Sequence, residues 1–324
     1  MKKFILFTFV TLFSTLATAQ AADQASFNQW LVQFKQKAKA DGISQETLDA
    51  AFRDAKYLPR VIELDRKQPE SKMTFAQYRE RIVSTQRINQ GRHEFRKHRA
   101  LLEEIGAAYG VQPQYIVALW GIETNYGTNT GGFDVIDSLA TLAHEGRRRD
   151  FFSDELLNAL HIINDDHISA DDMQGSWAGA MGQSQFMPSS FLAYAQDYNK
   201  DGKKDIWTTQ ADVFASAANY LARSGWHGDE KWGRQVRMAN VRESDISREN
   251  KKSLNEWSRL EVTQINGQSL PVVAGMKAGL VAPDGTSGPI YLTYHNYDVI
   301  MKWNRSTYFA TSVGLLADAI AAGQ

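Results

Sequence analysis

Glu123 is the residue of this sequence best placed for acid–base chemistry. It follows an apolar run from Tyr115 to Ile122, and Pro113 can open a helix there because its fixed φ suits a first helical turn. The apolar residues cover every face of a 3.6-residue period, which predicts a buried helix that ends before Gly127. Burial and the negative end of the helix dipole both raise the pKa of a carboxyl group. Such an acid can protonate the oxygen of a leaving sugar. The alternative is a partly exposed Glu at a helix end, which is the commoner case for an isolated carboxylate.

Residues 197–205 have the pattern of a calcium-binding loop. Oxygen-bearing side chains occupy loop positions one, three, five and nine, and Gly202 occupies position six, where such a loop turns sharply. The predicted ligands are the side chains of Asp197, Asn199 and Asp201 and the carbonyl oxygen of Lys203. Position twelve is Thr208 instead of the usual Glu, so Asp212 is the nearest candidate for the last carboxylate. A single loop of this kind indicates a structural ion, and a solvated turn is the alternative.

Two further segments carry groups that could bind a substrate. Residues 175–190 combine small residues with neutral amides and hydroxyls, which suit sugar hydroxyls and N-acetyl groups, although a tight helix–helix contact would have the same composition. The triplet Arg147 to Arg149 could bind acidic groups, although a basic run is more often a solvated surface. His144, His161 and His167 lack metal-ligand spacing, and we expect no metal there.

The N-terminus predicts export. Lys2 and Lys3, an apolar run from Phe4 to Leu16, and small residues up to Ala21 have the pattern of a cleaved signal peptide over residues 1–21. The apolar run is too short to span a bilayer. The chain has no cysteine, which removes both a lipid-acceptor site and disulfides. We therefore expect a free exported protein without a membrane anchor.

The charge balance argues against nucleic-acid binding. The chain has 36 basic and 37 acidic residues and a net charge of −1; without residues 1–21 the counts are 34 and 37, a net charge of −3. The positive charge is dispersed, so no basic field is expected.

Apolar spacing predicts a mainly helical chain with a small β-containing part near its end. Helices are expected around Phe27 to Phe34 and over Ser44–Phe52, Thr74–Tyr109, Ser138–Ala143, Phe151–Ile163, Pro188–Tyr198, Val213–Ser224, Tyr297–Trp303 and Ser306–Ala321. The remaining expectations are a loop with a short extended piece over Arg60–Ser71, a charged linker over Arg248–Lys252, a hairpin at Asn266-Gly267, a turn at Pro283–Gly285 and a strand over Ile290–Tyr294.

Taken together, the motifs resemble those of one enzyme family, the B-type lytic murein transglycosylases of Gram-negative bacteria in their soluble form. The resemblance covers about residues 25 to 322. The motifs are GIETNYG at 121–127, RRRDFF at 147–152, GSWAGAMGQSQFMPSS at 175–190, DYNKDGKKDIW at 197–207, AANYLARSGW at 217–226 and WNRSTYF at 303–309. Several long motifs in one order are far more specific than any of them alone.

The resemblance implies cleavage of the β-1,4 bond between N-acetylmuramic acid and N-acetylglucosamine in peptidoglycan, with a 1,6-anhydro end as product. Glu123 matches the catalytic acid, which would protonate the glycosidic oxygen and then accept the proton of the muramyl C6 hydroxyl. The implied substrate-binding residues are Tyr78, Arg147, Arg148, Ser176, Gln185, Phe186, Tyr220 and Asn304. Phe309 stands where relatives often have tyrosine. The implied calcium is structural, and no organic cofactor is expected.

The expected architecture is a mainly α, lysozyme-like catalytic core with additional parts on both sides. After the signal peptide we expect an N-terminal helical region (22–110), a catalytic core with an EF-hand-like calcium loop (111–230) and a C-terminal region with a small sheet and closing helices (231–324). The protein would be a periplasmic monomer whose partner is the glycan strand of peptidoglycan. A lysozyme-type hydrolase and a non-catalytic peptidoglycan-binding protein are the two alternatives.

Overall fold

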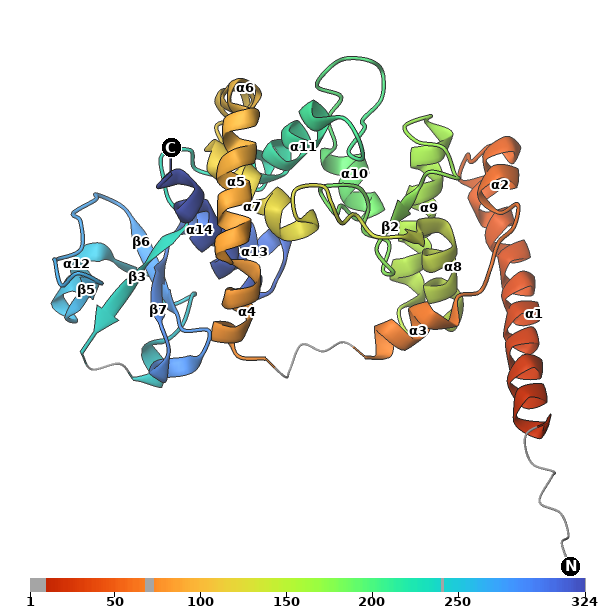
Figure 1. The fold of residues 1–324 in the computed structure, drawn as a ribbon, viewed down its shortest axis with the longest axis horizontal. Coiled ribbons are helices and arrows are strands. Elements are labelled where there is room, and N and C mark those ends of the chain that lie inside the picture. The colour runs from red at the N-terminus through yellow and green to blue at the C-terminus, as the bar shows by residue number, and fades with distance from the viewer. Residues whose placement is uncertain (1–9, 68–72, 240–241, 324) are drawn as a thin grey trace, which may run out of the picture. The chain divides into compact units, whose positions relative to one another are not determined.

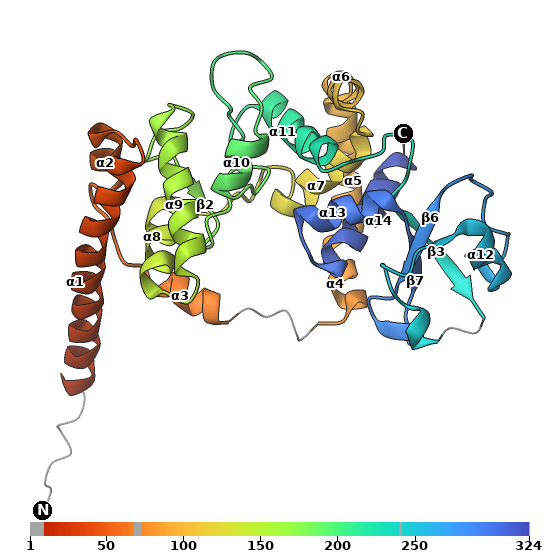
Figure 2. The same cartoon turned by 180° about the vertical axis from the view of Figure 1, so that it is seen from behind.

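The chain folds into two compact units that interleave along the sequence. The structure is a computed structural model that describes residues 10–67, 73–239 and 242–323. Unit 1 consists of residues 1–68 and 130–193, and unit 2 consists of residues 69–129 and 194–324 (Figures 1 and 2). This grouping by contact differs from the three consecutive regions predicted from the sequence, which stay a prediction about domains.

Unit 1 is built around helix α8 (Val135–Glu145), which packs against α1, α3 and α9. Its elements are α1 (Val10–Ala40), α2 (Gln45–Ala51), α3 (Pro59–Arg66), α9 (Arg149–Asn164), the first residues of α10 (Pro188–Tyr194), and the antiparallel pair β1 (Phe133–Asp134) and β2 (Gln174–Gly175). The prediction of a loop over Arg60–Ser71 was wrong for residues 60–66, which are helical, and residues 68–71 lie outside the described residues. Pro59 occupies the first turn of α3, where a proline favours helix formation.

Unit 2 contains a helical bundle that encloses α7 (Pro113–Thr124). This helix packs against α5, α6, α11 and α14, and all four contribute to one apolar core (Figures 1 and 2). The other helices are α4 (Phe75–Ile82), α5 (Thr85–Lys97), α6 (Arg99–Tyr109), α11 (Gln210–Arg223), α13 (His295–Trp303) and α14 (Thr307–Ala321). The helical stretch predicted from Thr74 to Tyr109 is therefore three helices. Ser84 starts the second of them, because its hydroxyl caps the backbone N–H of Arg87.

A five-stranded antiparallel sheet completes unit 2, in the order β4-β6-β7-β3-β5. Its strands are β3 (Gly233–Met238), β4 (Lys252–Ser253), β5 (Val262–Gln264), β6 (Lys277–Val281) and β7 (Ile290–Thr293), and the short helices are α12 (Leu254–Arg259), η1 (Glu243–Asp245) and η2 (Gly285–Ser287). Alternate residues of β7 face opposite sides: Ile290 and Leu292 join the small core around Trp257, and Tyr291 joins the core of the helical bundle. The sequence analysis identified β7 and missed β3, β6 and α12.

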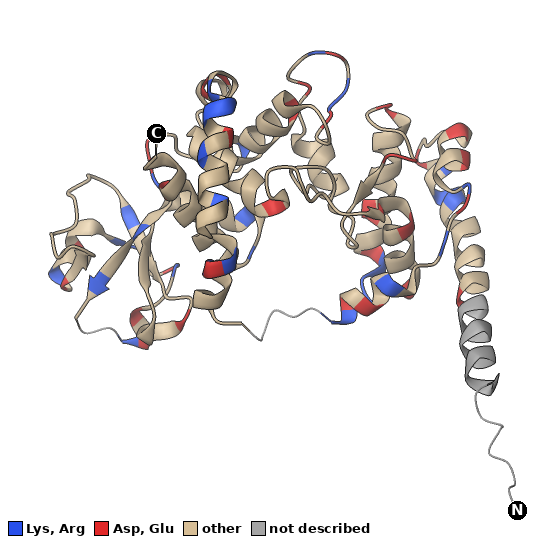
Figure 3. Cartoon of the chain, in the orientation of Figure 1, with Lys and Arg blue, Asp and Glu red and all other residues tan. Residues whose placement is uncertain are grey.

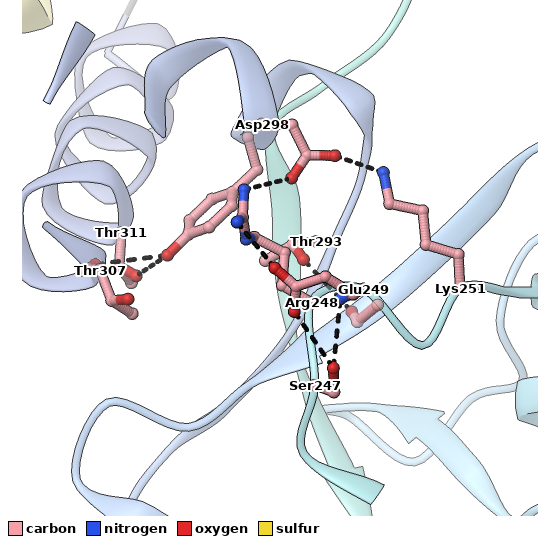
Figure 4. Close-up of polar contacts among 10 residues, drawn as sticks. Ser247, Arg248, Glu249, Lys251, Thr293, Asp298, Thr307 and Thr311 are labelled. Carbon is pink, nitrogen blue, oxygen red and sulfur yellow. Dashed lines mark hydrogen bonds and ion pairs between the residues drawn. The ribbon is translucent and has the colours of Figure 1, made fainter. Parts of the chain in front are cut away.

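The segment predicted as a charged linker is tied to the first turn of α13. Arg248 donates from Nη1 to Oδ1 of Asp298 at 3.0 Å, and the ammonium of Lys251 contacts the other oxygen of the same carboxylate (Figure 4). Arg248 also donates to Glu249 at 2.8 Å. The charges of this segment therefore pair with one another and with α13 instead of being solvated singly.

Lys, Arg, Asp and Glu are scattered over the helices and loops of both units (Figure 3). This agrees with the dispersed charge expected from the sequence. Among the described residues, no helix combines the length and apolar character needed to cross a bilayer. The first nine residues of the predicted signal peptide lie outside the described residues, and its remainder is part of α1.

Candidate active site

Glu123 lies in the last turn of α7, and the end of this helix is closely packed. Asn125 and Tyr126 both adopt left-handed backbone conformations, with φ of 50° and 60°, which fold the chain back on the helix. The ring of Tyr126 then covers Gly121 so tightly that a Cβ at this position would lie 2.6 Å from ring carbons. The hydroxyl of Tyr126 donates to the carbonyl oxygen of Arg87 on α5 at 2.7 Å. These contacts fix the turn that carries Glu123.

Among the described residues of unit 2, the indole of Trp303 is the one hydrogen-bond donor to the carboxyl group of Glu123. Nε1 of Trp303 donates to Oε1 of Glu123 at 2.7 Å. Burial raises the pKa of Glu123 to about 7, and the indole hydrogen bond opposes this rise by stabilising the carboxylate. The pKa of Tyr78 on α4 is also raised, first by burial and then by the negative charge of Glu123. Glu123 is therefore an acid that can hold its proton near neutral pH.

Three aromatic side chains form a row that begins at Glu123, namely Trp303 of α13, Tyr220 of α11 and Tyr194 of α10. The ring of Trp303 packs on that of Tyr220 at 4.7 Å between centroids, and Tyr220 packs on Tyr194 at 4.5 Å. The guanidinium of Arg223 lies over the Tyr194 ring at 5.2 Å. Aromatic faces of this kind suit the apolar faces of sugar rings.

Unit 2 thus brings Tyr78, Tyr220 and Glu123 into one neighbourhood. The exposed Asn304 follows Trp303 directly, and its Oδ1 accepts from the backbone N–H of Ser306 at 3.1 Å. Trp303 was missed as a site residue by the sequence analysis. The signal available was its place beside Asn304 in the WNRSTYF motif, but a tryptophan at a helix end is more often a core residue.

Three predicted substrate-binding residues, Ser176, Gln185 and Phe186, lie in a compact loop of unit 1. Oγ of Ser176 accepts from the backbone N–H of Ala180 at 3.0 Å, and Nε2 of Gln185 donates to the carbonyl oxygen of Thr130 at 3.0 Å. The buried Phe186 pairs with Met181 in an isolated antiparallel bridge. This loop is held by its own polar groups, and it is not the helix–helix contact that was the alternative.

The two arginines predicted to bind acidic groups have different surroundings in unit 1. Arg147 donates from Nε and Nη2 to Oδ2 of Asp65, at 3.0 and 2.5 Å. Arg148 instead places its guanidinium over the rings of Phe151 and Phe152, at 4.2 and 5.0 Å from their centroids. The positive charge of Arg147 is therefore shared with a carboxylate of the protein, and that of Arg148 lies on aromatic rings.

The loop predicted to bind calcium is ordered by its own side chains. The carboxylate of Asp197 accepts from the backbone N–H groups of Asp201 and Gly202, at 3.1 and 2.9 Å. Nδ2 of Asn199 donates to Oδ2 of Asp201 at 2.8 Å, which brings these two side chains together. Gly202 has a φ of 95°, as the turn at this position requires. The side chains of residues 197, 199 and 201 offer carboxylate and amide oxygens, which are the ligand types that calcium takes in proteins.

Asp212, the candidate for the last ligand, closes this loop from α11. Its Oδ1 accepts from the backbone N–H of Tyr198 and its Oδ2 from that of Asp205, both at 2.8 Å. The side chain is fully buried. Burial raises the pKa of Asp212, and these N–H donors oppose the rise. Among the described residues, no group of three or more His, Asp or Glu side chains has the geometry of a metal site. The assignment of Asp212 as a ligand stays a prediction.

Comparison with known proteins places the chain in a family. The model of the transglycosylase SLT domain family matches residues 26–318. The chain is 30% identical over 292 residues to membrane-bound lytic murein transglycosylase B of Escherichia coli, a match that covers 86% of this chain and 79% of the relative.

Two solved structures are also similar to this chain over most of its length. SltB3 from Pseudomonas aeruginosa, in complex with NAG-anhNAM-pentapeptide, is 43% identical with a TM-score of 0.89, over 92% of this chain and 80% of that one. The E. coli lytic transglycosylase SLT35, in complex with calcium, is 28% identical with a TM-score of 0.77, over 92% of this chain and 93% of that one.

These matches cover nearly the whole chain and agree with its mainly helical fold and small sheets. The protein is a lytic transglycosylase. It belongs to the transglycosylase SLT domain family and, within it, to the B-type lytic murein transglycosylases.

Proposed function

We propose that this enzyme cleaves the β-1,4 bond between N-acetylmuramic acid and N-acetylglucosamine in peptidoglycan, leaves a 1,6-anhydro end, and uses Glu123 as the acid and then the base. The observation that carries the proposal is the raised pKa of Glu123, about 7, in the last turn of a buried helix. At neutral pH about half of such side chains hold a proton that can be donated.

The reaction needs two proton transfers and no water. Glu123 first donates its proton to the glycosidic oxygen, and the bond from this oxygen to muramyl C1 breaks. The C6 hydroxyl of the same sugar then attacks C1, and its proton passes to the carboxylate of Glu123. The attacking group is attached to the substrate, so its effective concentration is high. This intramolecular route replaces the second carboxylate of ordinary glycosidases.

The same proposal assigns the substrate contacts. Tyr78, Tyr220 and Asn304 of unit 2 would bind the sugars next to Glu123, since two of them lie in its neighbourhood and Asn304 adjoins its hydrogen-bond donor. In unit 1, Ser176, Gln185 and Phe186 would bind sugars, and Arg147 and Arg148 would bind lactyl or peptide carboxylates. The complex of SltB3 with NAG-anhNAM-pentapeptide, a ligand that contains an anhydro sugar, supports this substrate class and product.

Calcium and location complete the proposal. The loop that starts at Asp197 would hold one structural calcium ion, as the calcium complex of SLT35 supports. The ion would stabilise the fold without a part in the chemistry. We place the enzyme in the periplasm, because its substrate class lies in that compartment and its N-terminus has the pattern of a signal peptide.

The test is the product of digestion of purified peptidoglycan, measured by mass spectrometry. The wild-type enzyme should release anhydro-muropeptides, which lack the water that a lysozyme-type hydrolase adds. Glu123→Gln should fold and bind glycan but release no product. Glu103→Gln, on the exposed surface of α6, is the matched control and should retain full turnover. Hydrated products from the wild type, or turnover by Glu123→Gln, would refute the assignment.

A further inference from the structure

The hydrogen bond from Trp303 to Glu123 distinguishes the two oxygens of the catalytic carboxyl group. Nε1 of Trp303 lies 2.7 Å from Oε1 of Glu123, and among the described residues of unit 2 none forms a hydrogen bond to Oε2. An indole N–H can donate a hydrogen bond but cannot accept one. We infer that Trp303 is a positioning residue that holds the acid proton of Glu123 on Oε2, so that this one oxygen performs both proton transfers.

The inference follows from the chemistry of the two groups. If the proton of Glu123 were on Oε1, this atom would be the hydroxyl oxygen of the acid, which is a poorer acceptor than the carbonyl oxygen, and the hydrogen bond from the indole would be weakened. With the proton on Oε2, Oε1 is the carbonyl oxygen of the acid and keeps its donor. After the proton has gone to the leaving glycosidic oxygen, Oε1 still accepts from Trp303, and Oε2 is the free oxygen that receives the proton of the C6 hydroxyl. The hydrogen bond is thus kept through the whole cycle. This inference rests on the proposed role of Glu123.

Trp303 is itself held by α11. Its ring packs on that of Tyr220, whose hydroxyl donates to the carbonyl oxygen of the preceding residue, Lys302, at 2.8 Å. The ammonium of Lys302 donates in turn to the carbonyl oxygen of Ser224 at 2.7 Å. Two hydrogen bonds and one ring contact therefore anchor the last turn of α13. These contacts hold the indole N–H of Trp303 towards Glu123, so a residue outside α7 fixes the position of Oε1.

The groups around the carboxyl of Glu123 support the same role for Trp303. Burial alone would raise the pKa of Glu123, and the Trp303 donor lowers it again, because a hydrogen bond to a carboxylate stabilises the charged form. Tyr78 of α4, whose pKa is raised first by burial and then by the charge of Glu123, is neutral near pH 7, as a tyrosine of ordinary pKa is. Trp303 therefore provides the hydrogen bond that keeps Glu123 able to ionise for the second step.

The test uses Trp303→Phe, which keeps an aromatic ring beside Tyr220 and removes the N–H. The pKa of Glu123 is read directly, from the ¹³C signal of its labelled carboxyl carbon, assigned by its absence in Glu123→Gln. A hydrogen bond to a charged group contributes about 1.5–3 kcal/mol, so the midpoint should move to higher pH by about one pH unit or more. In this variant either oxygen of Glu123 can carry the proton, and the orientation of its carboxyl group is no longer fixed. We therefore expect kcat to fall at least about tenfold while KM changes little. The alkaline limb of the kcat profile should move with the midpoint.

A second variant keeps the inference testable if Trp303→Phe folds poorly. In Trp303→His, Nε2 occupies the same ring position as the indole nitrogen, and it can donate when protonated there. This variant should restore the Glu123 midpoint and most of kcat, whereas loss of the indole's bulk alone would not be rescued. An unchanged midpoint in Trp303→Phe, or a midpoint in Trp303→His as high as in Trp303→Phe, would overturn the inference. The carboxyl titration needs no turnover, so it is separate from the product analysis that tests the proposed function.

Discussion

Arg147 donates twice to one carboxylate oxygen of Asp65, a residue 82 positions earlier in the sequence. Asp65 lies on α3 and its side chain is 3% exposed, whereas that of Arg147 is 53% exposed. The carboxylate of this ion pair is therefore buried, and its guanidinium is half exposed to solvent. Arg147 was predicted to bind acidic groups of the substrate, and in the structure it also forms an ion pair with a carboxylate of the protein.

The first prediction separates the two neighbouring arginines. Arg147→Ala leaves the buried carboxylate of Asp65 without its partner, and we expect a loss of about 1–3 kcal/mol in the free energy of unfolding. Arg148→Ala removes only the contact of a cation with two rings and should cost less than about 1 kcal/mol. Urea denaturation measures both values.

Kinetics on soluble muropeptides complete this comparison. If both arginines bind substrate carboxylates, both variants should raise KM. Because Arg148 pairs with no carboxylate among the residues that the structure describes, its variant should show the kinetic effect with little change in stability. Equal losses of unfolding free energy in the two variants would show that the ion pair between Arg147 and Asp65 does not contribute the expected stability.

The second prediction concerns the pH dependence of stability. The pKa of Glu123 rises from an ordinary value of 4.5 to about 7 in the folded protein, because burial penalises the charged form. The folded state thus binds a proton more tightly than the unfolded state. Its contribution to stability is complete below pH 4.5 and is lost as the pH rises towards 7. The loss amounts to about 2–4 kcal/mol.

Glu123→Gln lacks this titration and is the matched reference. The difference in unfolding free energy between the variant and the wild type should grow in favour of the variant from pH 4.5 to 7, and then stay constant. Other groups cancel in the difference, including Asp137, whose pKa is raised to about 6 mainly by burial. A difference that does not depend on pH would mean that Glu123 titrates normally, and the acid role would lose its basis.

The third prediction tests the packing that holds the end of α7. In Gly121→Ala the new Cβ would meet the ring of Tyr126 at 2.6 Å, and this ring is anchored to Arg87 through its hydroxyl. Alanine favours a helix over glycine by about 1 kcal/mol, but overpacking a fixed ring costs about 1–3 kcal/mol, so we expect a net loss. Turnover should fall as well, because Glu123 is two residues away.

Gly132→Ala is the control for this substitution. No atom lies within 4 Å of a Cβ at Gly132, and the change should alter the melting temperature and turnover little. If Gly121→Ala proved as stable and as active as the wild type, the contact with Tyr126 would not be what fixes Glu123.

The sequence predicted the local parts of this structure well, because those parts depend on neighbours in the chain. Pro113 and the apolar run after it define α7, and the glycines and left-handed residues beyond Glu123 end it. The small core around Trp257 could not be predicted in the same way. It is formed by short strands whose partners lie far apart, such as Gly233 with Thr293, and short apolar runs do not reveal their pairing.

The candidate site shows the same limit. Glu123 could be found from its own helix, but its hydrogen-bond donor Trp303 lies 180 residues later and is recognised only by its position in space. Likewise, Arg147 is part of a conspicuous basic triplet, and nothing in the sequence pairs it with Asp65. Motifs reveal which residues to consider, and tertiary contacts decide what each of them does.

The last prediction concerns calcium. Addition of calcium to the metal-free protein should raise its melting temperature, because an ion that binds only the folded state stabilises it by mass action. Asp201→Ala should abolish the gain, since this side chain is a predicted ligand that also joins Asn199. Differential scanning calorimetry, with and without calcium, measures the effect.

Asp205→Ala is the matched control in the same loop. The carboxylate of Asp205 accepts from the backbone N–H groups of Trp207 and Thr208, both within 2.9 Å, and it occupies loop position nine, which is not among the predicted direct ligands. Its loss should lower the melting temperature equally with and without calcium and leave the calcium-dependent gain intact. Magnesium at the same concentration should give a smaller rise, because it demands a stricter octahedral geometry than this loop of carboxylate, amide and carbonyl oxygens supplies. An equal calcium-dependent rise in wild type and Asp201→Ala would place the ion elsewhere.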